Sequence, residues 1–171
     1  IENYVPTSDK INIKEGATLK ITKAEETTIS DLTFEKTDSS TENFAKLEGN
    51  ISVTNATYNN ADIQTSGTIK LPDTIGDYKI GSLKIESGEL TIETLYAANL
   101  TNAGTLSTKT VTVTDNITNN GNFNATTSVE ANNITNAGEI TTPTVKATAE
   151  LSNAENATIT ATNGSITVGA N

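Results

Sequence analysis

A short motif repeats at a fixed step, about 17 residues long, between positions 100 and 151 of the chain. Its clearest copies begin at Leu100, Ile117 and Ile134, and each reads as an aliphatic residue followed by Thr-Asn-Ala-Gly or Thr-Asn-Asn-Gly. A weaker copy begins at Leu151 and carries Glu155 where the others have Gly. A unit this short cannot enclose a hydrophobic core alone, so neighbouring units must stack. The repeat therefore predicts a solenoid.

Within each copy, aliphatic residues alternate with polar ones, which is the two-residue period of a β-strand. Stacking would place equivalent aliphatic residues of successive coils in inward-facing columns. The predicted columns are Leu100, Ile117, Ile134 and Leu151; Leu106, Phe123 and Ile140; Val111, Val129 and Val145; and Ala97, Val113, Ala131 and Ala147. Val129 is one residue out of register with the others, which predicts a local bulge.

These patterns predict an all-β chain that forms a single parallel β-solenoid, or β-helix, with coils of about 17 residues. We expect roughly eight or nine coils, strands of about 3 to 6 residues and almost no helix. The rival fold is a sandwich of antiparallel strands, because short Thr-rich strands also suit that architecture.

Two polar positions recur beside the aliphatic columns. The first holds Asn, and we expect its amides to point inward at a bend, where they can bond open backbone groups and one another. The second holds Gly, where a tight corner would need a positive φ. The Asn positions are Asn102, Asn119, Asn136 and Asn153, and the Gly positions are Gly104, Gly121 and Gly138. Glu155 ends the Gly series, so we expect the last corner to differ.

The chain divides into three parts by pattern. Residues 1–10 do not match the coil pattern, and we expect a loose tail, a cap or a strand donated to a neighbour. Residues 11–171 form the solenoid, with irregular coils over 11–82 and regular coils over 83–171. Polar, turn-rich stretches at 35–43 and 72–78 predict loops inserted at corners of the irregular part.

Composition excludes several classes of function. The net charge is −10 and every basic residue is Lys, which argues against nucleic acid and anionic membranes as partners. The chain has no His and no Cys, so no imidazole or thiolate can serve as a metal ligand or a base. No run approaches the roughly 18 apolar residues of a membrane span. Accordingly, we assign no catalytic, cofactor-binding or metal-ligating residue.

The Asn-Ala-Gly and Asn-Asn-Gly corners, with alternating Val and Thr between them, resemble the β-helical repeats of large bacterial surface exoproteins. These are the filamentous-haemagglutinin-like proteins and the passenger domains of autotransporters. The resemblance covers roughly residues 83–171 and lies in the general character of the repeats, not in a diagnostic motif. The chain departs from those families in its repeat step of about 17 residues, which is shorter than is usual in them. It implies a β-helical fold and a location outside the cell or on its surface. The start at Ile1 without Met fits a processed or excised segment of a secreted protein.

We therefore expect a non-enzymatic extracellular structural or adhesive protein. It would act as a rigid scaffold that associates end to end into a filament or surface assembly, or as part of a longer adhesin stalk. The expected partners are other copies, joined by end-to-end stacking or N-terminal strand exchange, or the rest of a parent chain, together with host or surface glycans. Binding would involve the inserted loops around Asp38 and Asp73, because insertions in solenoids gather on one functional side.

Two alternatives stay open. An ice-binding β-solenoid would present rows of Thr on a flat face, and Thr110-Val-Thr-Val-Thr114 is such a row once. A carbohydrate-active β-helix enzyme would need a pair of carboxylates, for which Glu86, Glu89 and Glu93 are the nearest set. These three alternate with Leu90 and Ile92, so a solvated strand face is the better interpretation.

Overall fold

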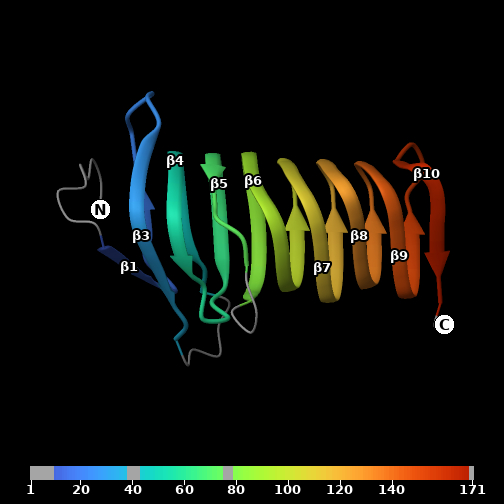
Figure 1. Cartoon of the computed structure of the whole chain (residues 1–171), viewed down its shortest axis with the longest axis horizontal. Helices are drawn as coiled ribbons and strands as arrows, with labels where there is room; N and C mark the ends of the chain where they lie inside the picture. The colour runs from blue at the N-terminus through green and yellow to red at the C-terminus, as the bar shows by residue number, and fades with distance from the viewer. Residues whose placement is uncertain (1–9, 38–42, 75–78, 170–171) are drawn as a thin grey trace.

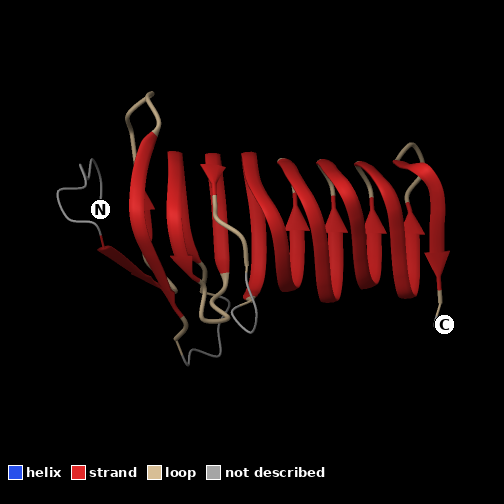
Figure 2. Cartoon of the chain, viewed as in Figure 1, coloured by secondary structure: helices blue, strands red, loops and turns tan. Residues whose placement is uncertain are grey.

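The computed structural model describes residues 10–37, 43–74 and 79–169. All ten strands belong to one sheet, which winds into a solenoid of about eight turns, and every strand pair in it is parallel. Figure 1 shows the coils stacked side by side along the long axis, with β1 near one end and β10 at the other. Strands and the turns between them make up the whole described part of the chain, with no helix (Figure 2). The predicted parallel β-solenoid is confirmed.

The strands follow one another along the solenoid in chain order, except that β2 pairs with β4. Their bounds are β1 Lys10–Lys14, β2 Thr18–Lys20, β3 Thr27–Glu35, β4 Ala45–Thr57, β5 Ile63–Lys70, β6 Ile80–Asn102, β7 Thr105–Asn119, β8 Asn122–Asn136, β9 Glu139–Asn153 and β10 Thr158–Val168. The expectation of uniformly short strands was wrong, since β2 has 3 residues but β6 has 23. The backbone stays extended and paired through most bends, so one strand covers several sides of a coil.

The length of a coil changes along the stack. Ala45 lies beside Ile63 and Ile117 lies beside Ile134, so the step is longer by a single residue in the earlier coil. Val129 pairs with Val111 in the coil before it and with Val145 in the coil after it, and the first of these steps is the longer one. Register shifts flank these pairs, so the predicted irregularity at Val129 is confirmed.

The core is the row of inward-facing columns that the repeat predicted. Leu100, Ile117 and Ile134 are each 1% exposed, and the columns through Phe123 and Val129 are equally buried. Leu151 is the last member of the first column among the described residues, and it is only half-buried because no described coil lies beyond it. The wider N-terminal coils are filled by aromatic rings: Phe34 and Tyr58 stack with centroids 5.7 Å apart and planes 7° from parallel.

The predictions for the irregular parts fall only partly within the described residues. Of the expected tail at 1–10, only Lys10 is described, and it begins β1. β3 ends at Glu35, where the first insertion was expected, and Asp38 lies outside the described residues. The start of the second insertion, at 72–74, is described.

Candidate functional surfaces

The recurring Asn side chains form a continuous ladder inside the solenoid. The Nδ2 atom of Asn102 donates to Asn119 Oδ1 at 2.8 Å, Asn119 donates to Asn136 at 2.8 Å, and Asn136 donates to Asn153 at 2.7 Å. The first three of these residues are 0% exposed. Each Nδ2 atom also donates to backbone carbonyls at the corner, for example from Asn119 to those of Gly121 and Glu139, both at 3.0 Å. The predicted inward ladder is confirmed, and its side-chain amides form hydrogen bonds within the solenoid.

The recurring glycines lie in a column of their own, but the reason predicted for them was wrong. Gly104, Gly121 and Gly138 do not have positive φ. A Cβ atom on Gly121 would lie 2.1 Å from the carbonyl oxygen of Gly104, and one on Gly138 would lie 2.2 Å from that of Gly121. These glycines are required because each backbone rests directly on the one before it. Positive φ is a second requirement only earlier in the column, for instance at Gly67 and Gly88.

The last corner differs from the others, as the sequence predicted. The backbone amides of Asn122 and Glu139 donate to the carbonyls of Gly104 and Gly121. The equivalent bond to the Gly138 carbonyl comes from the Thr158 amide at 3.0 Å. Two extra residues therefore lie in this corner, and a turn closed by the bond from the Ala157 amide to the Ala154 carbonyl accommodates them. Residues 154–156 of this turn are exposed.

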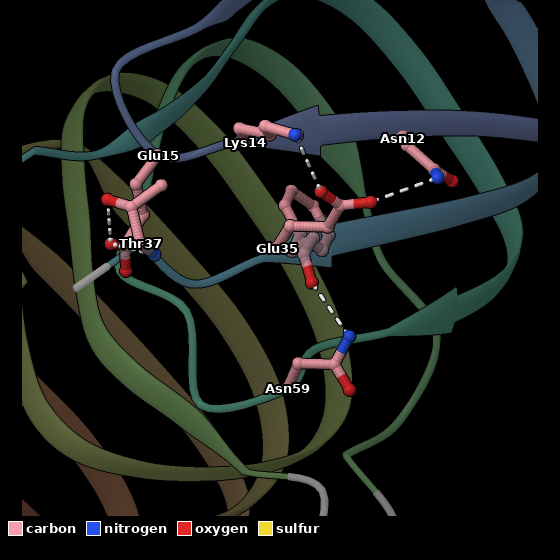
Figure 3. A network of polar contacts seen from close by, with 7 residues as sticks. Asn12, Lys14, Glu15, Glu35, Thr37 and Asn59 are labelled. Carbon is pink, nitrogen blue, oxygen red and sulfur yellow. Dashed lines mark hydrogen bonds and ion pairs between the residues drawn. The ribbon is translucent and has the colours of Figure 1, made fainter.

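At the N-terminal end, a network of polar side chains joins coils that are far apart in the sequence (Figure 3). Glu35 accepts from Asn12 Nδ2 at 3.0 Å and lies 3.6 Å from Lys14 Nζ. Glu15 accepts from the amide and hydroxyl of Thr37 at 2.8 and 3.0 Å, and from the amide of Asp62 at 2.9 Å. Burial alone would raise the pKa of Glu15, but these donors outweigh it and the pKa lies below its usual value of 4.5.

Changing Glu15 to Gln is expected to lower thermal stability at neutral pH and to lose that effect in acid. Because the folded-state pKa lies below the unfolded one, the carboxylate stabilises the fold above pH 4.5 and stops doing so as the pH falls through the folded value. The Tm difference between the two proteins should thus shrink as the pH falls from 7 to about 3. Glu93→Gln, at an exposed position, is the matched loss of one charge, and an equal pH trend there would contradict the assignment.

The carboxylates considered for catalysis lie on the surface. Glu86 and Glu89 flank the corner at Gly88, and both are exposed, as is Glu93. Glu86 accepts from Gln64 Nε2 at 2.6 Å and from Lys84 Nζ at 3.3 Å. Within the described ranges, no group of three acidic, His or Cys residues is placed to hold a metal ion.

The segment at 72–74 is bound down to the next coil. Asp73 Oδ1 accepts the Thr94 amide at 2.8 Å, and the Thr74 hydroxyl both donates to the Thr94 carbonyl and accepts the Tyr96 amide. The Tyr58 hydroxyl donates to the Pro72 carbonyl, and burial raises the pKa of that phenol. Asp73 is therefore a structural residue in this conformation, with its carboxylate turned to the strand.

A second Asn ladder runs on the outside of the solenoid, which the sequence analysis did not identify. Asn133 Nδ2 donates to Asn116 Oδ1 at 2.9 Å, and Asn116 Nδ2 donates to Asn99 Oδ1 at 3.2 Å. We call this surface the Asn-Thr face. It consists of Asn99, Asn116 and Asn133 in one column and Thr101, Thr118 and Thr135 in the next, together with Ser82 and Lys84, which line the same surface. The regular Asn-x-Thr spacing was the available signal.

The row of Thr that suggested ice binding is continued by hydroxyl residues at Thr110, which pairs with Thr94 and Ser128, but not at Thr112. Thr112 pairs with Tyr96 on one side and Glu130 on the other, and Lys146 follows Glu130. Glu130 and Lys146 form an ion pair at 2.9 Å. This face therefore carries bulky and charged side chains beside its Thr residues.

The two ends of the solenoid differ in how their apolar residues are covered. At the N-terminal end, Ile13, Leu19 and Ile21 are only 2–4% exposed. At the C-terminal end, Ile166 and Val168 are 47% and 53% exposed, and they are the exposed large hydrophobic residues of the described part of the chain. β10 also has neither a charged residue nor Pro, whereas β1 carries two Lys residues.

No helix in the described ranges has the length and apolar character needed to cross a membrane. Comparisons of the chain with protein-family models, with curated proteins and with solved structures give no match.

Proposed function

We propose that the chain is a non-enzymatic structural protein of the extracellular space or the cell surface, a rigid scaffold that joins end to end with a second copy of itself. The observation that carries this proposal is the exposed, uncharged surface of β10. An edge strand with free N–H and C=O groups is normally protected by charges, Pro or a covering segment. β10 has no charged residue and no Pro, and its Ile166 and Val168 are exposed to solvent.

The contact we propose joins two C-terminal coils. Two chains with a net charge of −10 repel one another over most of their surfaces, but two uncharged β10 strands can approach without a like-charge contact. The first coil already has its apolar residues covered, so it offers a second copy little area to bury. A contact between identical ends is self-complementary and closes as a dimer. The result is a rod of twice the length.

The test is the state of association in solution. Val168→Lys places a charge in the proposed contact, and we expect it to convert a dimer into a monomer in light scattering coupled to gel filtration. Thr167→Lys is the matched control, because Thr167 pairs with Lys146 on the lateral surface and the change adds the same charge there. This variant should remain dimeric.

A wild-type chain that stays monomeric at high concentration would overturn the proposal and would favour the rival, in which further coils of a longer adhesin stalk cover the same end. Filaments in electron micrographs would show that copies associate head to tail and not through two C-terminal coils. Such a contact would use the N-terminal residues 1–9, which lie outside the described part of the chain.

A further inference from the structure

A cavity of about 440 Å³ lies on the Asn-Thr face. Its floor comes from successive coils, with Ser82, Lys84, Asn99 and Thr118 among the lining residues, and Phe44, just before β4, also lines it. Ligand clefts in proteins typically measure about 300 to 1,000 Å³. The cavity is therefore large enough for a small ligand, and it combines an aromatic ring with a polar floor.

The outer Asn ladder ends in this cavity. Its hydrogen bonds all run in one direction, from Asn133 to Asn116 and from Asn116 to Asn99. Asn99 accepts the last of them, and its own Nδ2 atom donates to no residue in the described ranges. Hydrogen bonds in a chain polarise one another, so the terminal N–H group is a strengthened donor. A ligand oxygen placed there would continue the ladder by one step.

The other groups in the cavity define the ligand further. The hydroxyls of Ser82 and Thr118 have no intramolecular bond in the described part of the chain, so both can donate and accept. The Lys84 ammonium is 3.3 Å from Glu86 Oε1, which offsets its charge. The site thus offers an aromatic surface, an amide donor and hydroxyl groups, without an unopposed charge.

We propose that this cavity binds a neutral saccharide with an N-acetyl group. One face of the sugar ring, with its C–H groups, would pack on Phe44, the ring hydroxyls would bond to Ser82 and Thr118, and the acetamido carbonyl would accept from Asn99. The inference goes beyond the proposed scaffold function, because it gives the side of the rod a ligand while the end forms the contact between copies.

Two other ligand classes fit the surface less well. A peptide cannot add here as an extra strand, because the backbone groups of the floor are already paired with the coils on both sides. An acidic saccharide would meet a protein with a net charge of −10 and a Lys84 already paired with a carboxylate. A neutral sugar avoids both difficulties.

The test is calorimetric titration of the full chain with triacetylchitotriose, with cellotriose as the probe that lacks acetamido groups. Wild-type protein should bind triacetylchitotriose and bind cellotriose at least tenfold more weakly. Phe44→Ala removes the ring, and Asn99→Asp removes the donor while keeping the oxygen that Asn116 bonds. Each change should weaken binding at least tenfold. Asn124→Asp, at an exposed position on another side of the coil, adds the same charge and should leave binding unchanged.

The proposal is overturned if neither sugar binds at millimolar concentration, if Phe44→Ala and Asn99→Asp bind like wild type, or if an acidic oligogalacturonate binds more tightly than the neutral probes. Circular dichroism of each variant verifies that it is folded. Val168→Lys should bind triacetylchitotriose like wild type, so a failure of the end contact and a failure of the saccharide site give different results.

Discussion

Changing Gly121 to Ala is expected to destabilise the regular coils by about 3 kcal/mol or more, although it adds only one methyl group. The new Cβ atom would lie 2.1 Å from the carbonyl oxygen of Gly104 and 3.0 Å from its carbonyl carbon. That oxygen also accepts the Asn122 amide at 2.9 Å. Relieving the clash requires the two coils to separate, and separation stretches this hydrogen bond and its neighbours. Since the obstructing atoms are backbone, no side chain can rotate away.

Gly164→Ala is the matched control for this prediction. Gly164 has a φ of +71°, but an added Cβ atom meets nothing within 4 Å. It should therefore show only the backbone cost of a left-handed residue, about 1–2 kcal/mol. Urea unfolding measures the overall loss, and hydrogen exchange locates it, because stacked repeats need not unfold in one step. An equal effect at both positions, or normal protection of β7 and β8 in Gly121→Ala, would contradict the proposed contact.

The fold was predictable because the same local pattern occurs several times. A single alternating stretch fits a sandwich as well as a solenoid, but a fixed step places Leu100, Ile117 and Ile134 in one column, and the structure pairs Ile117 with both of the others. The Asn ladder was predictable for the same reason: Asn119 lies two residues after an inward position and so points inward too. Repetition turned a weak local signal into a strong one.

The part that the sequence did not predict depends on contacts between coils. Glycine at a corner is usually required for its positive φ, and nothing in the local sequence around Gly121 indicates that the backbone of Gly104 lies against it. The strand lengths were underestimated because local sequence marks the bends but not whether pairing continues through them. In both cases the deciding atoms belong to another coil.

The candidate surfaces show the same limit. Glu15 binds groups 22 and 47 residues away, and no motif links them. Phe44 lines one cavity with Ser82 and Asn99, which lie 38 and 55 residues further along the chain, and no local motif links the three. The apolar and uncharged character of β10 was visible in the sequence, and the structure leaves its Ile166 and Val168 exposed.

Changing Asn119 to Ala is expected to cost about 2–3 kcal/mol, because four hydrogen bonds meet at its amide. It accepts from Asn102 Nδ2 at 2.8 Å and donates to Asn136 Oδ1 at 2.8 Å and to the carbonyls of Gly121 and Glu139 at 3.0 Å. Asn119 is 0% exposed, so water cannot replace these bonds, and the groups left behind carry a desolvation cost. The same column holds Leu47, Thr65 and Ile85 in earlier coils, so its shape accepts an apolar side chain.

Two variants separate the parts of this effect. Asn119→Leu fills the space but cannot form the hydrogen bonds. The loss of stability that it shares with Asn119→Ala therefore measures the hydrogen bonds. Any stability that Leu restores relative to Ala measures the cost of the cavity. Asn133→Ala breaks the outer ladder, where the broken bond to Asn116 is exposed and water can take its place. We therefore expect Asn133→Ala to cost less than about 1 kcal/mol in urea unfolding. Equal losses for Asn119→Ala and Asn133→Ala would mean that the inner ladder contributes no more than a solvent-exposed one, contrary to its burial.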